Sequence, residues 1–400
     1  MTTAQQDPVV IVGAARTPMG GFQGSMSGFT ASELGAHAIQ QAVLRAGHPT
    51  LSEKVDEVIM GCVLPAGQGQ APARQAALTA GLPLSSACTT INKMCGSGMK
   101  AIMMAHDSLL AGSTQVAVAG GMESMSNAPY LLPKARGGMR MGHGQVMDHM
   151  FLDGLEDAYD KGRLMGTFAE ECADQYSFTR QAQDEFAIRS LARAKQATEN
   201  GGFQWEIAPI EVASRKGTEL ISTDEQPLKA DPAKVPTLKP AFRREGGTVT
   251  AANSSSISDG AAAVVMMKQS HAEKLGIKPL ARILGHSTHA QKPSLFTTAP
   301  VGALQGLFAK TGLTAAQVDL FEINEAFAVV TMAAMVDLNL PADKVNIHGG
   351  ACALGHPIGA SGARIVCTLI GALKKTNGKI GVASLCIGGG EATALAIELM

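Results

Sequence analysis

Short apolar runs alternate along most of the chain with alanine-rich stretches that are typical of helices. Strand-like runs lie at 9–12, 116–119 and 380–383, and a helix-like run occupies 97–110. Strands that are apolar throughout are buried on both faces, because helices cover each side of their sheet. The alternation therefore predicts an α/β fold built from layers of helices and strands.

The first and last parts of the chain resemble each other segment by segment. Four segments of the first part have counterparts in the same order: 51–59 in 313–321, 97–100 in 361–364, 116–119 in 380–383 and, more weakly, 10–13 in 282–285. One such match would be chance, but several in one order indicate a duplicated unit. We therefore expect two similar halves.

The middle of the chain differs from its flanks in charge. Residues 121–248 hold roughly half of all charged side chains, together with all three tyrosines and the only tryptophan. This composition predicts a solvated insertion within the first half. The expected domains are 1–120 plus 249–271 as the N-terminal half, 121–248 as an inserted loop domain, and 272–400 as the C-terminal half.

The overall composition excludes several classes of protein. The formal net charge of −1 provides no basic surface for nucleic acid or an anionic membrane. No apolar run reaches the roughly 18 residues that a membrane-spanning helix needs. The seven cysteines contain no CxxC pair, and the polar residues 1–8 do not resemble a signal peptide. We expect a cytoplasmic globular protein without nucleic-acid or membrane partners.

The first candidate for chemistry is Cys95, in the sequence INKMCGSG at 91–98. A cysteine between a strand and a helix start lies at the positive end of the helix dipole, which favours its thiolate form. The alternative is a buried, inert cysteine. The same segment fits a dinucleotide fingerprint, but the next strand, 116–119, ends in Gly-Gly-Met rather than in the acidic residue that would hold a ribose.

The second candidate is His356, in the glycine-rich sequence GACALGHPIGASG at 350–362. A histidine between glycine and proline is expected on a rigid loop, which suits an imidazole held toward a pocket. His348, Cys352 and His356 are spaced four apart and could instead be metal ligands. The glycines and the proline disfavour a regular helix there, so the even spacing does not bring the three together.

Two further segments follow apolar strands. Cys386 precedes a glycine triplet at 388–390, whose backbone N–H groups are suited to an oxyanion hole, although a plain turn is the alternative. Asn324 follows a strand of the second half and could orient a water or cap a helix. Together with Cys95 and His356, these residues form a set of nucleophile, base and acid.

These segments resemble the signatures of the thiolase family, and the match runs the length of the chain. The signatures are Asn92-x-x-Cys95-Gly-Ser-Gly, Gly355-His-Pro-x-Gly-x-Ser-Gly362 and Cys386-Ile-Gly-Gly-Gly390, with Asn324–Phe327 as a fourth. The resemblance implies a thiolase-like five-layer αβαβα fold, two duplicated halves with an inserted loop domain, and a homotetramer or homodimer.

The resemblance also implies a role for each residue. Cys95 would be the acylated nucleophile, His356 the base that activates it, and Cys386 the group that moves the α-proton of the second acyl-CoA. Two oxyanion sites are implied, one from His356 and a water on Asn324, the other from the backbone N–H groups of Cys95 and Gly388. The remaining matches suggest Ala251 and Ser255 for the pantetheine arm, Met165 and Phe327 for the acyl pocket, and Arg215 for the nucleotide end of coenzyme A.

The sequence is therefore expected to encode an acetyl-CoA C-acetyltransferase that joins two acetyl-CoA molecules reversibly through an acyl-cysteine intermediate. No metal or organic cofactor is expected, because coenzyme A thioesters are the substrates. Leu164 stands before Met165 where short-chain members commonly have histidine, and Thr297–Pro300 replaces a more glycine-rich loop. These departures leave a second interpretation open, a degradative 3-ketoacyl-CoA thiolase of broader chain length in fatty-acid β-oxidation.

Overall fold

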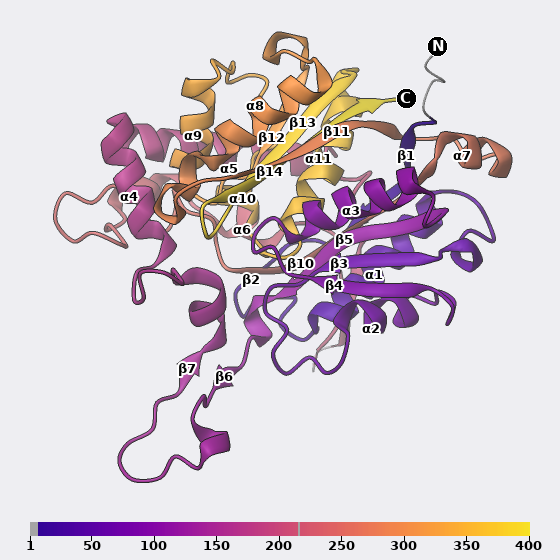
Figure 1. Ribbon diagram of the computed structural model, residues 1–400. Helices are drawn as coiled ribbons and strands as arrows, with labels where there is room; N and C mark the ends of the chain where they lie inside the picture. The colour runs from indigo at the N-terminus through magenta and orange to yellow at the C-terminus, as the bar shows by residue number, and fades with distance from the viewer. Residues whose placement is uncertain (1–6, 215–216) are drawn as a thin grey trace.

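The computed structural model describes residues 7–214 and 217–400 (Figure 1). In this part of the chain the main sheet has 10 strands. Its path is β12 (Leu320–Ile323), β13 (Ile380–Ile387), β14 (Glu391–Leu399), β11 (Ala281–Ala290), β1 (Val9–Arg16), β10 (Ser258–Lys268), β5 (Val116–Ser124), β3 (Glu57–Gly61) and β4 (Ala87–Ile91), with β2 (Gly20–Gly21) paired to β10.

The strand order confirms the duplicated unit. Strands β3 and β5 are parallel, and so are their counterparts β12 and β13. Strand β4, at the edge of the first half, is also parallel to β3. The neighbours β5–β10–β1 and β13–β14–β11 are antiparallel. The two halves meet at β1 and β11, which pair only at Val10 with Arg282 and at Ile11 with Ala281.

Helices cover both halves in layers, as the five-layer αβαβα prediction requires (Figure 1). The outer helices are α1 (Ala31–Arg45) and α2 (Pro72–Thr79) on the first half, and α8 (Ala299–Thr311) and α9 (Ala328–Asp337) on the second. Helices α3 (Ser97–Ala111) and α11 (Ser361–Thr376) lie between the two halves of the sheet. The alternation in β1 follows this layering, because Val10 and Val12 pack on the outer side while Val9 and Ile11 pack toward the central helices.

The inserted segment contributes two longer helices and a projecting arm, residues 130–148, which carries β6 and β7 (Figure 1). Its elements are β6 (Tyr130–Leu131), β7 (Met147–Asp148), α4 (Met165–Tyr176), α5 (Arg180–Glu199), β8 (Ile210–Ser214), β9 (Gly217–Ile221) and α6 (Glu225–Lys229). The main sheet extends a few residues beyond the expected boundary at residue 120. Strand β5 continues to Ser124, because residues 120–124 still pair with β10.

The remaining elements are short. They are α7 (Gln269–Leu275) and α10 (Ala351–Leu354), a π-helical turn at Phe151–Leu155, and 3-10 turns at Ser52–Lys54, Met125–Asn127, Ala135–Gly137, Pro232–Thr237, Pro293–Thr298 and Ala315–Gln317. Helix α7 spans the predicted boundary at 271/272. No helix within residues 7–214 and 217–400 combines the length and the apolar character that crossing a membrane requires.

Arg16, at the end of β1, holds the inserted segment against the first half. Its Nε lies 2.6 Å from Oε1 of Glu206, and its two terminal nitrogens lie 2.7 and 2.9 Å from the carboxylate oxygens of Asp224. All three side chains are fully buried. The paired carboxylates raise the pKa of Arg16 even though burial acts to lower it, so the guanidinium stays charged.

We predict that Arg16→Met destabilises the protein by about 3–5 kcal/mol, because it leaves two buried carboxylates without the cation that pairs with them. Arg16→Lys restores one charge but not the bidentate contact, so its loss should be smaller. Urea unfolding at one fixed protein concentration measures both variants. A wild-type midpoint for Arg16→Met would mean that the ion pairs do not stabilise the fold.

Candidate active site

One cavity of about 360 Å³ gathers most of the residues that the sequence singles out. It is lined by Cys95, His356, Cys386, Gly388, Met165, Phe327, Ala251 and Ser255. Asn324 is buried behind the lining rather than on it. Arg215 lies outside the described residues. The cavity therefore brings together side chains from both halves and from the inserted segment.

Cys95 lies on a tight elbow between β4 and α3. Met94 has a positive φ of 46°, which is unusual for a residue with a side chain. Asn92 stabilises this turn by accepting a hydrogen bond from the Met94 N–H at 2.9 Å. Ser97 completes it, because its Oγ accepts from the Lys93 N–H at 2.8 Å and donates to the Met94 carbonyl at 2.6 Å. The elbow presents a half-buried Cys95 to the cavity.

Burial favours the neutral thiol of Cys95 over the thiolate that the helix start favours. Burial raises the pKa of Cys95 to about 11. Hydrogen bonds from the backbone N–H groups of Gly388 and of Cys95 itself lower this pKa only in part. The helix start was the signal in the sequence, but desolvation outweighs it. The two N–H groups are the pair expected to form one oxyanion site.

His356 is held as a neutral imidazole with one defined tautomer. Ser361 Oγ donates to the Pro357 carbonyl at 3.0 Å, so its contact of 2.5 Å with His356 Nδ1 must be one in which the imidazole N–H donates. The other ring nitrogen, Nε2, has no hydrogen-bond partner among the described residues. Burial, assisted by the charge of Arg364, lowers the pKa of His356 to about 3. Its Nε2 lone pair is therefore free to accept a proton.

Cys386 is the second thiol of the cavity. It lies near the end of β13 and is fully buried. Burial raises its pKa well above the usual value, and the nearby Cys95 sulfur adds to the effect. The structure thus places two neutral thiols and one neutral imidazole around the same space, which is the arrangement needed for acyl transfer followed by carbon-acid chemistry.

Asn324 presents a free donor. Its backbone N–H donates to the Ser384 carbonyl at 3.0 Å, and its Oδ1 accepts from Arg364 at 3.2 Å. The Nδ2 group is buried and has no hydrogen-bond partner within residues 7–214 and 217–400. Because Arg364 fixes the orientation of the amide, Nδ2 is available to hold a water, as predicted for the second oxyanion site.

The predicted substrate contacts form an apolar wall beside the three reactive groups. The Phe327 ring packs edge-on against Phe242 and Phe296, with ring centroids 6.1 and 6.4 Å apart. The backbone N–H of Ser255 donates to the Ala326 carbonyl at 2.9 Å, which ties the loop at 251–255 to the strand end that carries Asn324. These contacts shape a pocket suited to an acyl chain and a pantetheine arm.

The sequence did not identify Glu123, which connects the loops of the two halves. Its carboxylate accepts from the backbone N–H groups of Val63, Leu64 and Gly359, at 2.9, 3.1 and 2.8 Å. Burial raises the pKa of Glu123 to about 7 despite these bonds. A Cβ at Gly359 would lie 2.6 Å from Glu123 Oε2, which explains the glycine at that position of the histidine loop.

Ser361 and Arg364 were also missed as site residues, although both stand in the repeated segment 361–364. Their role depends on side-chain contacts with His356 and Asn324 that spacing alone does not reveal. The structure does not form a metal site from His348, Cys352 and His356, the alternative ligands that their even spacing suggested. His348 packs against the ring of Phe203, and Cys352 Sγ lies 3.6 Å from the Glu325 carbonyl.

We predict that iodoacetamide alkylates Cys95 slowly at neutral pH. The raised pKa means that the thiolate fraction, and with it the rate, should rise about tenfold per pH unit between pH 7 and 10. Peptide mapping identifies the labelled cysteine, and Cys386→Ala provides the control for the second thiol. A rate that is already constant at neutral pH would reveal a resting thiolate and imidazolium pair.

Comparison with known proteins agrees with this geometry. Residues 9–270 match the family model described as "Thiolase, N-terminal domain". Residues 277–399 match the model described as "Thiolase, C-terminal domain". Acetyl-CoA acetyltransferase 2 of Arabidopsis thaliana is 52% identical over 396 residues, which cover 98% of this chain and 97% of the relative. Acetyl-CoA acetyltransferase IA of Candida tropicalis is 46% identical over 394 residues, covering 98% and 97%.

Two solved structures are similar over nearly their whole length. The acetyl-CoA acetyltransferase of Bacillus anthracis superposes with a TM-score of 0.95 at 41% identity, covering 99% of each chain. A thiolase of Ascaris suum in complex with coenzyme A superposes with a TM-score of 0.92 at 41% identity, covering 98% of this chain and all of the other. The chain belongs to the thiolase family.

Proposed function

We propose that this thiolase is an acetyl-CoA C-acetyltransferase, which converts two acetyl-CoA molecules reversibly into acetoacetyl-CoA and coenzyme A. The observation that carries the proposal is the neutral His356 imidazole, with its free Nε2, in a cavity shared by two thiols. The acetyl-CoA acetyltransferases among its relatives support this choice of substrate.

The first half-reaction transfers an acetyl group to Cys95. His356 Nε2 takes the thiol proton as the sulfur attacks the thioester carbonyl of acetyl-CoA. The N–H groups of Cys95 and Gly388 are placed to stabilise the tetrahedral oxyanion, where removal of one such donor typically costs about 3–4 kcal/mol. The coenzyme A thiolate leaves and takes the proton of Cys386, so that acetyl-Cys95, an imidazolium and a Cys386 thiolate remain.

The second half-reaction forms the carbon–carbon bond. The Cys386 thiolate takes an α-proton from the second acetyl-CoA, and the His356 imidazolium and a water on Asn324 stabilise the enolate oxygen. The enolate carbon attacks the acetyl carbonyl and expels the Cys95 thiolate, which recovers its proton from His356. Both thiols and the imidazole are then neutral again, and all protons are accounted for without a metal or organic cofactor, which we propose the reaction does not need.

The same set would serve a degradative 3-ketoacyl-CoA thiolase. The observation that favours this second candidate is the apolar wall, in which Leu164 joins Phe151 and Leu155 at the cavity. Thiolysis of acetoacetyl-CoA and of longer 3-ketoacyl-CoAs with one enzyme preparation decides between the two. We expect the highest kcat/KM for acetoacetyl-CoA. A higher value for the longer substrates would assign the enzyme to β-oxidation.

Assembly into a homotetramer, or a homodimer, is also proposed. Two features of the described chain support it: the edge of the sheet at β4, which has a partner strand on one side, and the projecting arm. Large apolar side chains are exposed on this arm, namely Tyr130, Leu132, Met139, Met141 and Val146. Light scattering measures the mass of the assembly.

The unpaired state of all seven cysteines supports a reducing compartment such as the cytoplasm.

The two thiols should be separable by mutation. Cys386→Ser should still accept an acetyl group on Cys95, because the leaving coenzyme A thiolate can take its proton from solvent. Condensation and exchange of the acetyl α-protons with solvent should fall by about 10³-fold, because serine is a far weaker acid than cysteine. Labelled acetyl-CoA with peptide mapping follows acylation, and NMR follows the exchange. Proton exchange at the wild-type rate would contradict the role of Cys386. Label on Cys88, which lies in β4 seven residues before Cys95, would contradict the role of Cys95.

A further inference from the structure

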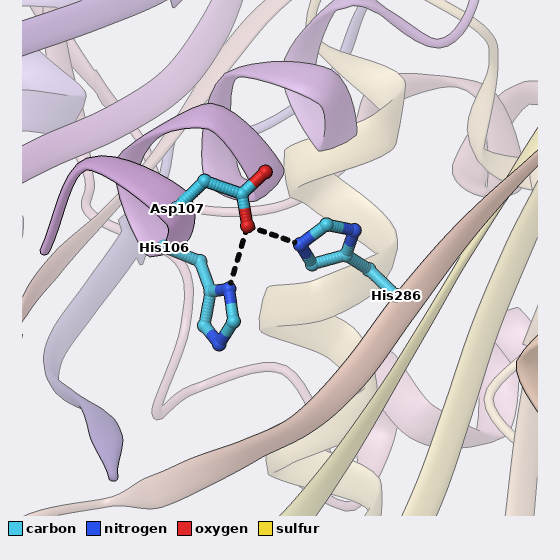
Figure 2. Close-up of side chains that lie close together, drawn as sticks. All are labelled: His106, Asp107 and His286. Carbon is cyan, nitrogen blue, oxygen red and sulfur yellow. Dashed lines mark hydrogen bonds and ion pairs between the residues drawn. The ribbon is translucent and has the colours of Figure 1, made fainter. Parts of the chain in front are cut away.

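A second group of ionisable side chains lies where the two halves meet, away from the acyl cavity. His106 and Asp107 belong to α3 and His286 belongs to β11, so one helix of the first half faces one strand of the second (Figure 2). Asp107 Oδ1 lies 3.2 Å from His106 Nδ1 and 2.9 Å from His286 Nε2. The three ligand atoms all lie within 4.8 Å of one another.

The surroundings suit a metal ligand set better than a solvated ion pair. Each imidazole side chain is only 11% exposed, whereas the Asp107 side chain is 58% exposed and opens the group to solvent. A metal binds the neutral form of each imidazole through the lone pair of its ligand nitrogen.

We propose that His106, Asp107 and His286 bind a divalent transition-metal ion, for which Zn²⁺ is the probe. Zinc ligands at 2.0–2.2 Å in a tetrahedron lie about 3.3 Å apart, which is close to the 3.2 and 2.9 Å that separate Asp107 Oδ1 from the two imidazole nitrogens. Both nitrogens point at this oxygen, so the carboxylate of the exposed Asp107 side chain has to move aside to admit the ion between them. With the ion bound, the neutral His106 ring carries its proton on Nε2 and the neutral His286 ring carries its proton on Nδ1. Water completes the coordination on the side where Asp107 is exposed.

The ion would link the two halves and would take no part in catalysis. Asp107 lies ten residues after the first residue of α3, which corresponds to about 15 Å along the helix from the elbow of Cys95. Because α3 and β11 belong to different halves, the metal cross-links them without taking part in the acyl cavity. Binding to the folded state alone then raises the thermal stability of the protein.

Calorimetric titration with Zn²⁺ tests the proposal. The titration uses the full-length Cys95→Ala protein after chelator treatment, because the cavity thiol would otherwise compete for zinc. We expect one ion per chain and a higher melting temperature. Adding His286→Gln or Asp107→Asn should weaken binding by more than about 10-fold, since even the loss of a residue that only supports a ligand costs about that much.

His271→Gln, on α7 and outside the cluster, is the matched control and should leave binding unchanged. Asp107→Asn keeps an oxygen that accepts from an imidazole, so it preserves a hydrogen-bonded contact while removing the charged ligand. Zinc binding that is unaffected by His286→Gln and Asp107→Asn would overturn the site. The absence of a one-to-one event in the Cys95→Ala protein would overturn it as well.

Discussion

The thiols of Cys95 and Cys386 and the imidazole of His356 are largely withdrawn from water between the two halves, and all three are uncharged at rest. The cost of placing a charge in this setting is what raises the pKa of each thiol and lowers that of the imidazole. The three groups therefore become charged only during the reaction, when the thioester of a bound substrate can be attacked. Proton transfer and carbonyl attack are coupled for this reason, and no reactive thiolate is held in the absence of substrate.

The duplicated fold supplies two serines that position the reactive groups. Ser97 and Ser361 occupy matching places at the starts of α3 and α11, and each donates its hydroxyl to a backbone carbonyl of the preceding loop. In the first half this serine also shapes the elbow of Cys95, and in the second half it accepts from His356. The two matching helix starts thus position the nucleophile in one half and the base in the other.

The sequence predicted the layers, the duplication and the reactive set, because glycine-rich loops after apolar strands are local features. It did not predict Glu123, whose partner Gly359 is 236 residues away in the other half. Nor did it give the protonation state of Cys95, because the helix start is visible in the sequence while the surrounding burial is not. The Asp107 group was missed for the same reason, since His286, 179 residues away in the other half, is brought to it only by the fold.

The most direct test of this account is the ¹⁵N NMR spectrum of histidine-labelled protein at neutral pH. The chain has ten histidines, and comparison with His356→Gln identifies the signals of His356. A neutral ring held by Ser361 gives one protonated nitrogen, Nδ1, and one unprotonated nitrogen, Nε2. That pattern is the result the account predicts. Two protonated nitrogens on His356 in the substrate-free enzyme would reveal an imidazolium paired with a thiolate, and would contradict it.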